Sequence, residues 1–338
     1  MNILFTSAGR RNYLIAYFKK ALQGNGVIVA VDYDPCASAL READIVASVP
    51  MINDNNYIQT LKTIIDQHSI NLVIPLNDLE LPILSKHKFT LEGPKTIIVV
   101  SELQMTNLAF DKWKTYQFLV DHHIRTPKTY LNVESTLEAM TNKEIKYPLI
   151  IKPRWGTGSI GIYIAENEEQ LHLFHKALSI KIKRSILRDI GNLEETIIIQ
   201  EKIEGDEYGM DILNDLNGNY YGSFAKKKLS MRSGETDKAI SVIEERFSNL
   251  GKRVGSLTGH LGTMDCDFFV TPTNEIYFLE MNPRFGGGYP FSHEAGANIA
   301  EMYILWAKGQ KEVTHLNTYK AGMIFSKYDK IIQVNNVK

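Results

Sequence analysis

The sequence contains few cysteines and carries little net charge. Only Cys36 and Cys266 occur among the 338 residues, and two cysteines so far apart give no disulfide framework and fit a reducing compartment. Neither has a metal-binding spacing, so we interpret both as packing residues. The formal net charge is −1, which argues against binding of nucleic acid or of an anionic membrane through bulk charge.

Apolar runs of membrane-spanning length are also missing from the sequence. Residues 1–5 lead directly into an expected strand and do not have the layout of a secretory signal. We therefore expect a cytoplasmic protein with no nucleic-acid and no membrane partner. The length and the 44% of hydrophobic residues suit two or three packed units.

Strand and helix patterns alternate through the first hundred residues. Strands are expected at 2–6, 27–32, 72–76 and 97–100, and helical periodicity covers 12–22 and 57–68. This alternation predicts an α/β domain at residues 1–100, built on a doubly wound parallel sheet. The turn Ser7-Ala8-Gly9-Arg10 lacks the full glycine fingerprint, so it gives little support for a nicotinamide cofactor.

A glycine-rich loop follows a strongly β-forming stretch that ends near Lys152. Its members Gly156, Gly158 and Gly161, with Ser159 among them, lie between two expected strands. Backbone N–H groups of such a loop can wrap phosphates, and the preceding lysine adds a positive charge. The alternative is a glycine-rich hairpin without a ligand. The loop is not a P-loop, because no Gly-Lys-Ser/Thr opens a helix after it.

A second hairpin brings together oxygen ligands. Asp267 opens one strand, residues 271–275 form the turn, and the returning strand leads to Glu280 and Asn282. Counting from the turn places Asp267 opposite Glu280 and Asn282, and two carboxylates with an amide oxygen suit a hard cation such as Mg²⁺. Arg284 follows, with a guanidinium suited to phosphate or carboxylate. The alternative is an acidic hairpin end with solvated charges.

Three other stretches carry structural expectations. Residues 106–122 read as one helix that contains Lys112, and residues 241–258 read as an amphipathic helix. The basic stretch 226–235 reads as a solvated polar loop when it is considered without its neighbours.

Taken in order along the chain, these signals resemble the ATP-grasp superfamily. The similarity is greatest to the carbamoyl-phosphate-synthetase-like and amino-acid-ligase branches, and residues 282–290 are similar to the final motif of those branches. The resemblance implies an N-terminal pre-grasp domain at 1–100, followed by a two-subdomain α+β ATP-grasp fold at 101–308. The smaller lid subdomain would cover about 125–203, and 309–338 would form a C-terminal extension on the grasp domain.

The resemblance also implies roles for individual residues. Phosphate contacts would come from Lys112 and Lys152, under a closing loop that contains Gly156, Gly158, Ser159 and Gly161. The adenine would meet a hinge at Glu201, Lys202 and Ile203, and the ribose would meet Glu207. The metal ligands would be Asp267, Glu280 and Asn282, for Mg²⁺ or alternatively Mn²⁺. The catalytic cations would be Arg284, Lys228 and Arg232.

The implied reaction is ATP-dependent ligation of a carboxylate and an amine. ATP would phosphorylate the carboxylate, and attack of the amine on the acyl phosphate would give an amide, ADP and phosphate. Asn77, Asp78, Glu80 and Arg10 follow strands of the N-terminal domain, where they would suit an amino-acid-like acceptor or be ordinary surface charges. Two rivals are phosphorylation of bicarbonate or carbamate, and a non-catalytic ATP-binding regulator. A homodimer agrees with the resemblance.

Overall fold

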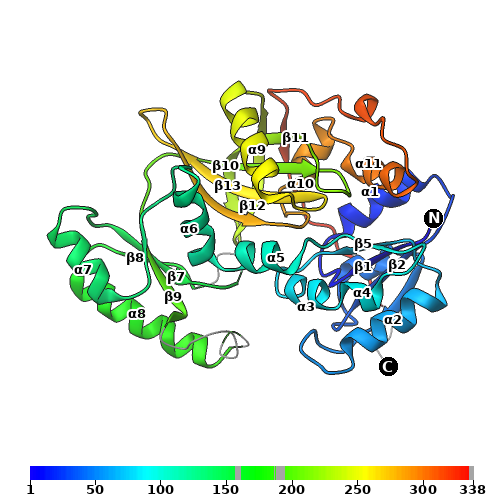
Figure 1. The fold of residues 1–338 in the computed structure, drawn as a ribbon, viewed down its shortest axis with the longest axis horizontal. Coiled ribbons are helices and arrows are strands. Elements are labelled where there is room, and N and C mark those ends of the chain that lie inside the picture. The colour runs from blue at the N-terminus through cyan, green and yellow to red at the C-terminus, as the bar shows by residue number, and fades with distance from the viewer. Residues whose placement is uncertain (157–160, 186, 188–194, 335–338) are drawn as a thin grey trace.

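The computed structural model describes residues 1–156, 161–185, 187 and 195–334. Three sheets organise the chain, and Figure 1 shows the N-terminal one at the right, a large one in the centre and a small one at the left. The structure confirms the predicted class, an α/β N-terminal domain with a parallel sheet followed by α+β parts with antiparallel sheets.

The N-terminal sheet has five parallel strands in the order β3-β2-β1-β4-β5. The order reverses its direction on either side of β1, as a doubly wound sheet requires. One face packs under α1 in a core that includes Phe5 and Phe18, and the other packs under α2 in a core that includes Leu4 and Leu61. The strands are β1 (Ile3–Thr6), β2 (Ile28–Asp32), β3 (Ile45–Ser48), β4 (Leu72–Pro75) and β5 (Ile97–Ile98). The helices are α1 (Asn12–Leu22), α2 (Tyr57–Gln67), α3 (Leu81–Lys86) and α4 (Lys88–Leu91), with a 3₁₀ turn at Ser38–Arg41.

The large sheet has six strands in the order β14-β13-β10-β11-β12-β15, all paired antiparallel. Its strands are β10 (Asp206–Asn214), β11 (Tyr220–Arg232), β12 (Glu235–Val242), β13 (Thr263–Val270), β14 (Ile276–Asn282) and β15 (Ile324–Ser326). The helices that accompany it are α5 (Leu103–Phe110), α6 (Lys112–Asp121), α9 (Glu245–Thr258), α10 (Tyr289–Glu294) and α11 (Ile299–Ala307), with a 3₁₀ turn at Thr314–Leu316.

The small sheet has its own hydrophobic core. Four strands in the order β6-β9-β7-β8 pack against α7 and α8 through residues such as Leu149, Leu171 and Leu178. The strands are β6 (Thr129–Tyr130), β7 (Leu149–Pro153), β8 (Tyr163–Ala165) and β9 (Ile197–Glu201), and the helices are α7 (Val133–Thr141) and α8 (Glu168–Lys183).

Three local predictions were wrong. The single helix expected at 106–122 is two helices, because Asp111 adopts an extended conformation and caps α6 by accepting a hydrogen bond from the Trp113 amide. The stretch 226–235 is not a solvated loop but the hairpin of β11 and β12. The helix expected from 241 begins only at Glu245, because β12 continues to Val242.

The N-terminal domain and the large sheet share one hydrophobic core. Phe18 of α1 makes edge-to-face contacts with Phe285 and with Tyr303 of α11, and all three are buried. The two units are therefore packed together as one body. No helix in the described part of the chain combines the length and apolar character needed to cross a membrane.

Candidate active site

The hairpin of β13 and β14 forms the floor of the candidate site. Its register pairs Asp267 with Glu280 and Asp265 with Asn282, so the predicted juxtaposition of Asp267 and Glu280 is confirmed. Gly209 on the neighbouring strand lies opposite Asp267, where the absence of a side chain leaves room above the carboxylate.

The two carboxylates experience opposite electrostatic effects. Burial raises the pKa of Asp267 to about 7, and the carboxylates of Asp265 and Glu280 act in the same direction. Burial also disfavours the charged form of Glu280, but the ammonium groups of Lys112 and Lys152 outweigh it and lower the pKa of Glu280. The floor is thus a half-buried cluster of negative charge that needs a positive partner.

Lys228 supplies part of that positive charge. Its Nζ lies 2.7 Å from an oxygen of Asp267 and 2.7 Å from an oxygen of Glu207. Burial by itself would disfavour the ammonium, yet these two carboxylates raise the pKa of Lys228 above its usual value. Lys228 therefore stays protonated between β10 and β13.

The donors on the floor are compatible with Mg²⁺. Asp267 and Glu280 supply facing carboxylate oxygens, the ligands that a hard cation prefers. Asn282 contributes an amide whose N–H group points to the carbonyl of Asp265, at 3.4 Å. In the described ranges no group of three or more His, Cys, Asp or Glu side chains is arranged to hold a metal, so other oxygens would have to complete the coordination.

A cavity of about 790 Å³ lies between the small and the large sheet. Its wall from the small sheet includes Lys152 and Gly156, and its wall from the large sheet includes Asp267 and Glu280. The predicted hinge residues Glu201, Lys202 and Ile203 line the same cavity, together with Lys112 and Glu207. The structure therefore brings seven of the ten predicted nucleotide contacts into one space.

Lys112 and Lys152 both line this cavity. Lys112 begins α6 and donates from Nζ to the carbonyl of Gly156 at 2.6 Å. Burial lowers the pKa of Lys152 to about 8, and the nearby Lys112 ammonium acts in the same direction. A polyanion bound here would relieve the repulsion between the two amines.

The glycine-rich loop is only partly described. Gly156 lines the cavity with a left-handed φ of 106°, while Gly161 packs against Pro153 and Leu178 of α8 instead. Gly158 and Ser159 lie outside the described residues.

A second cavity of about 410 Å³ adjoins the first and opens toward the N-terminal domain. The two cavities share Met231, Gly234, Asp267 and Glu280 in their walls. The residues that the N-terminal domain contributes to the second cavity are Ser7, Ala8, Gly9, Arg10, Arg11, Leu76, Asn77 and Asp78. The half-buried carboxylates of Asp267 and Glu280 thus lie where a nucleotide-sized space meets a smaller polar one.

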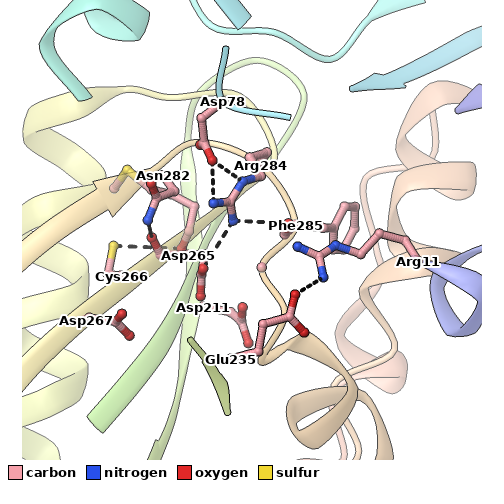
Figure 2. A network of polar contacts seen from close by, with 12 residues as sticks. Arg11, Asp78, Asp211, Glu235, Asp265, Cys266, Asp267, Asn282, Arg284 and Phe285 are labelled. Atoms are coloured by element: carbon pink, nitrogen blue, oxygen red, sulfur yellow. Dashed lines mark hydrogen bonds and ion pairs between the residues drawn. The ribbon is translucent and has the colours of Figure 1, made fainter. Parts of the chain in front are cut away.

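In the wall of the second cavity, Arg284 links a residue of the N-terminal domain to a residue of the large sheet. Its Nε and Nη2 donate to Asp78 at 2.9 and 2.6 Å, and its Nη1 donates to Asp265 at 3.2 Å. Figure 2 shows the guanidinium between these carboxylates, beside Asn282. Burial alone would disfavour the charge, but Asp78 and Asp265 raise the pKa of Arg284.

Comparison with known sequence families explains this arrangement. Residues 109–288 match the family described as the ATP-grasp domain. The chain belongs to the ATP-grasp family. Residues 3–99 match the PylC-like N-terminal domain, which agrees with an α/β unit that precedes the grasp part.

Two curated relatives show which kinds of ATP-grasp protein this chain is similar to. It is 24% identical over 198 residues to a D-alanine–D-alanine ligase from Helicobacter pylori, which covers 57% of this chain and 56% of that protein. It is 20% identical over 202 residues to the arginine-specific carbamoyl phosphate synthase large chain of Bacillus subtilis, covering 57% of this chain but 18% of that protein. The chain therefore spans only part of the length of these relatives.

Solved structures show the same fold at low identity. An L-amino acid ligase from Bacillus licheniformis superposes with a TM-score of 0.71 at 16% identity, over 93% of this chain and 76% of that one. The biotin carboxylase domain dimer of 2-oxoglutarate carboxylase from Hydrogenobacter thermophilus, in complex with MgADP, ADP and bicarbonate, gives 0.72 at 16% identity, over 92% and 70%.

One predicted catalytic cation of the ATP-grasp site lies elsewhere. Arg232 is in neither cavity wall among the described residues. Its guanidinium pairs with Asp329 at 2.6 Å and with Asp237 at 3.1 Å, because the C-terminal segment runs along β12. The structure therefore does not bring Arg232 to the carboxylate floor.

Other site residues were missed at the level of the sequence. Asp265 lies two positions before Asp267 on the same face of β13, a spacing that a longer predicted strand would have revealed. Glu235 forms an ion pair with Arg11, in which the Nη1 of Arg11 lies 2.9 Å from Oε1 of Glu235. Figure 2 also shows this contact. Burial disfavours its charge, but Arg11 and Lys327 lower the pKa of Glu235 to about 2. No local signal links residues so distant in sequence.

Proposed function

We propose that this chain is an ATP-dependent carboxylate–amine ligase that works through an acyl phosphate and releases ADP and phosphate. The observation that carries the proposal is that Asp267 and Glu280 lie in the walls of both cavities. ATP would occupy the larger cavity, and the carboxylate and amine would occupy the smaller one. The transferred phosphoryl group would then cross above the two carboxylates.

In this proposal the lysines and the floor bind the triphosphate. Lys112 and Lys152 contact its α- and β-phosphates, while Glu201, Lys202 and Ile203 contact the adenine and Glu207 the ribose. Gly156 and the loop that follows, with Gly158, Ser159 and Gly161, exclude water from the reacting groups. Asp267, Glu280 and Asn282 would hold Mg²⁺, or alternatively Mn²⁺, which would supply positive charge next to the phosphates.

The cations next to the floor serve the transfer itself. A carboxylate resists attack by an amine because its leaving group would be an oxide, and phosphorylation supplies a good leaving group. Lys228 and Arg284 would stabilise negative charge on the phosphoryl group as it moves. Arg232 stays a weaker catalytic candidate, since it would first have to leave Asp237 and Asp329.

The rival substrate is bicarbonate or carbamate, as the carbamoyl phosphate synthase relative suggests. Bicarbonate would be phosphorylated by the same residues, so the site does not separate the two reactions. A third candidate is an ATP-binding regulator without turnover. For the assembly we propose a cytoplasmic protein that forms a homodimer, because the carboxylase domain with this fold is a dimer.

The direct test is ADP release from Mg²⁺-ATP across amino acids, hydroxy acids and bicarbonate, with hydroxylamine as a general amine. Acid-dependent ADP release with hydroxamate formation would support the acyl phosphate, whereas AMP release would contradict it. ADP release with bicarbonate alone would favour the rival substrate. ATP binding without ADP release across the panel would favour the regulator.

Glu280→Gln provides the matched test of the floor. We expect a fall of at least about 100-fold in Mg²⁺-dependent ADP release, with an unchanged circular dichroism spectrum. Glu275→Gln, at the exposed turn of the same hairpin, is expected to keep wild-type activity. Normal ADP release by the Glu280 variant would rule out its assignment as a metal ligand.

A further inference from the structure

The turn between β1 and α1 presents its residues to the second cavity in an unusual conformation. Ser7 has a left-handed φ of 49°, rare for a residue with a side chain, and Gly9 has a φ of 53°. Such conformations persist only where surrounding contacts enforce them, and they cluster at functional sites. Contacts with neighbouring residues must therefore hold the turn in this conformation.

Two buried carboxylates beneath the turn hold it in place. Ser7 Oγ donates to Glu80 at 2.7 Å, and the Gly9 amide donates to Asp32 at 2.8 Å. Glu80 is completely buried, and Asp32 is 7% exposed. Anchors at the end of β2 and immediately before α3 thus fix the backbone that carries Arg10 into the cavity wall.

The cations of the cavity wall are paired with carboxylates, with one exception. The pairs are Arg11 with Glu235, Lys226 with Asp211, Lys228 with Asp267 and Arg284 with Asp78. Arg10 also lines the cavity, but it makes no hydrogen bond or ion pair with any residue of the described chain. Its side chain is exposed, so all of its N–H donors remain available to a ligand.

We propose that Arg10 determines substrate specificity by binding a carboxylate of the substrate that is not phosphorylated. The proposal rests on the proposed ligase function and adds that the substrate in the second cavity carries this additional negative group. An arginine fork binds a carboxylate through two parallel hydrogen bonds. Arg10 comes from the N-terminal domain and Glu280 from the large sheet, so different elements of the cavity wall would hold the carboxylate that Arg10 binds and the reacting one.

The test compares amino acids with their carboxamides, which keep the amine but lack the negative carboxylate. Thermal shift of the full chain in Mg²⁺-ADP would be recorded for the twenty common amino acids and their amides. Binding to the folded state raises the melting temperature by an amount that grows with the logarithm of the affinity, so shifts measured over a series of ligand concentrations give the affinity. We expect at least one acid to bind wild type more tightly than its amide, and this difference to fall about 10- to 100-fold in Arg10→Gln.

Two further variants separate charge from fold. Arg10→Lys is expected to recover part of the preference for the acid, because it restores the positive charge without the fork. Arg41→Gln, in the exposed 3₁₀ turn outside the cavity wall, is expected to keep the wild-type preference. A preference that survives in Arg10→Gln would overturn the proposal, and so would a panel in which no acid binds wild type better than its amide.

The binding test is independent of turnover. ADP release tests the ligase function, whereas the difference between acid and amide tests Arg10. If ADP release fails while the Arg10-dependent preference is present, the proposed ligase reaction is wrong and the proposed carboxylate site is supported. If ADP release succeeds while the preference is absent or survives in Arg10→Gln, only the role of Arg10 falls.

Discussion

At the scale of single residues, Lys152 illustrates how the fold adjusts the chemistry of a side chain. The residue is 5% exposed, and its amine has no carboxylate within ion-pair distance among the described residues, while Lys112 lies close enough to repel it. Burial and repulsion together lower the pKa of Lys152 to about 8. The amine therefore changes charge near physiological pH, where an exposed lysine would stay protonated.

This pKa predicts the pH dependence of nucleotide binding. Phosphates favour the protonated amine, so binding takes up a proton whenever Lys152 is neutral in the free protein. The contribution of Lys152 to affinity should vary little below about pH 7 and fall above it, by about tenfold at pH 9 relative to pH 7. Isothermal titration of Mg²⁺-ADP across this range measures the effect.

Lys152→Arg is the control for that titration, because arginine stays charged throughout the range. Its affinity is expected to lack the tenfold decline between pH 7 and 9 that Lys152 causes, whatever its absolute value. Equal declines in wild type and in the arginine variant would show that another group causes the pH dependence.

At the scale of secondary-structure elements, an element could be predicted when the residues that hold it in place lie close together in the sequence, and it was missed when they lie far apart. The β13–β14 hairpin was predicted down to the pairing of Asp267 with Glu280, because its turn residues and its alternation are local. The basic end of β11, residues 226–232, was missed, because lysines are uncommon in strands. Lys226 and Lys228 belong there only because β10 supplies Asp211 and Glu207, 15 and 21 residues away in sequence.

The break between α5 and α6 has a similar cause. Helical periodicity continues through residues 106–122, yet Arg154 binds Asp111 through Nε and Nη2, both at 2.7 Å. The two residues are 43 positions apart, so only the folded chain can favour an extended Asp111 over a continuous helix. An aspartate can cap a helix, which was the available local signal.

Asp111→Asn tests the role of that ion pair. The pair is buried, with Asp111 4% and Arg154 9% exposed, and loss of the Asp111 charge leaves Arg154 with Glu195, at 3.0 Å, as its remaining carboxylate partner. We expect a loss of about 3–5 kcal/mol in the free energy of unfolding, and weaker Mg²⁺-ADP binding because Lys112 is the next residue. Urea denaturation and calorimetry measure the two effects.

The exposed pair between Arg125 and Glu275 gives the comparison. Its removal by Glu275→Gln is expected to change the free energy of unfolding by less than about 1 kcal/mol. Similar losses in both variants would mean that burial of the Asp111 pair has no special effect.

At the scale of the whole molecule, the hydrophobic cores divide the chain differently from the sequence. The first hundred residues looked like an independent domain, but one core contains Phe5 and Phe18 as well as Phe285 and Tyr303. The small sheet keeps a separate core around Leu149 and Leu171. The body that carries Arg10 and the carboxylate floor is therefore continuous, and the small sheet is the part that packs by itself.

Phe18→Ala tests whether this body opens as one unit. Phe18 is completely buried, and its truncation should cost about 3–5 kcal/mol. In hydrogen exchange the amides of β1 and of α11 should lose protection together, because both depend on the same core. The amides of β7 and β9 should keep their protection, since they belong to the separate core.

Phe89→Ala is the control for this experiment. At a site 89% exposed, it should change the protection of neither group of amides. Loss of protection in β1 alone would show that the N-terminal domain opens independently, and Arg10 would then belong to a part that can move relative to the floor.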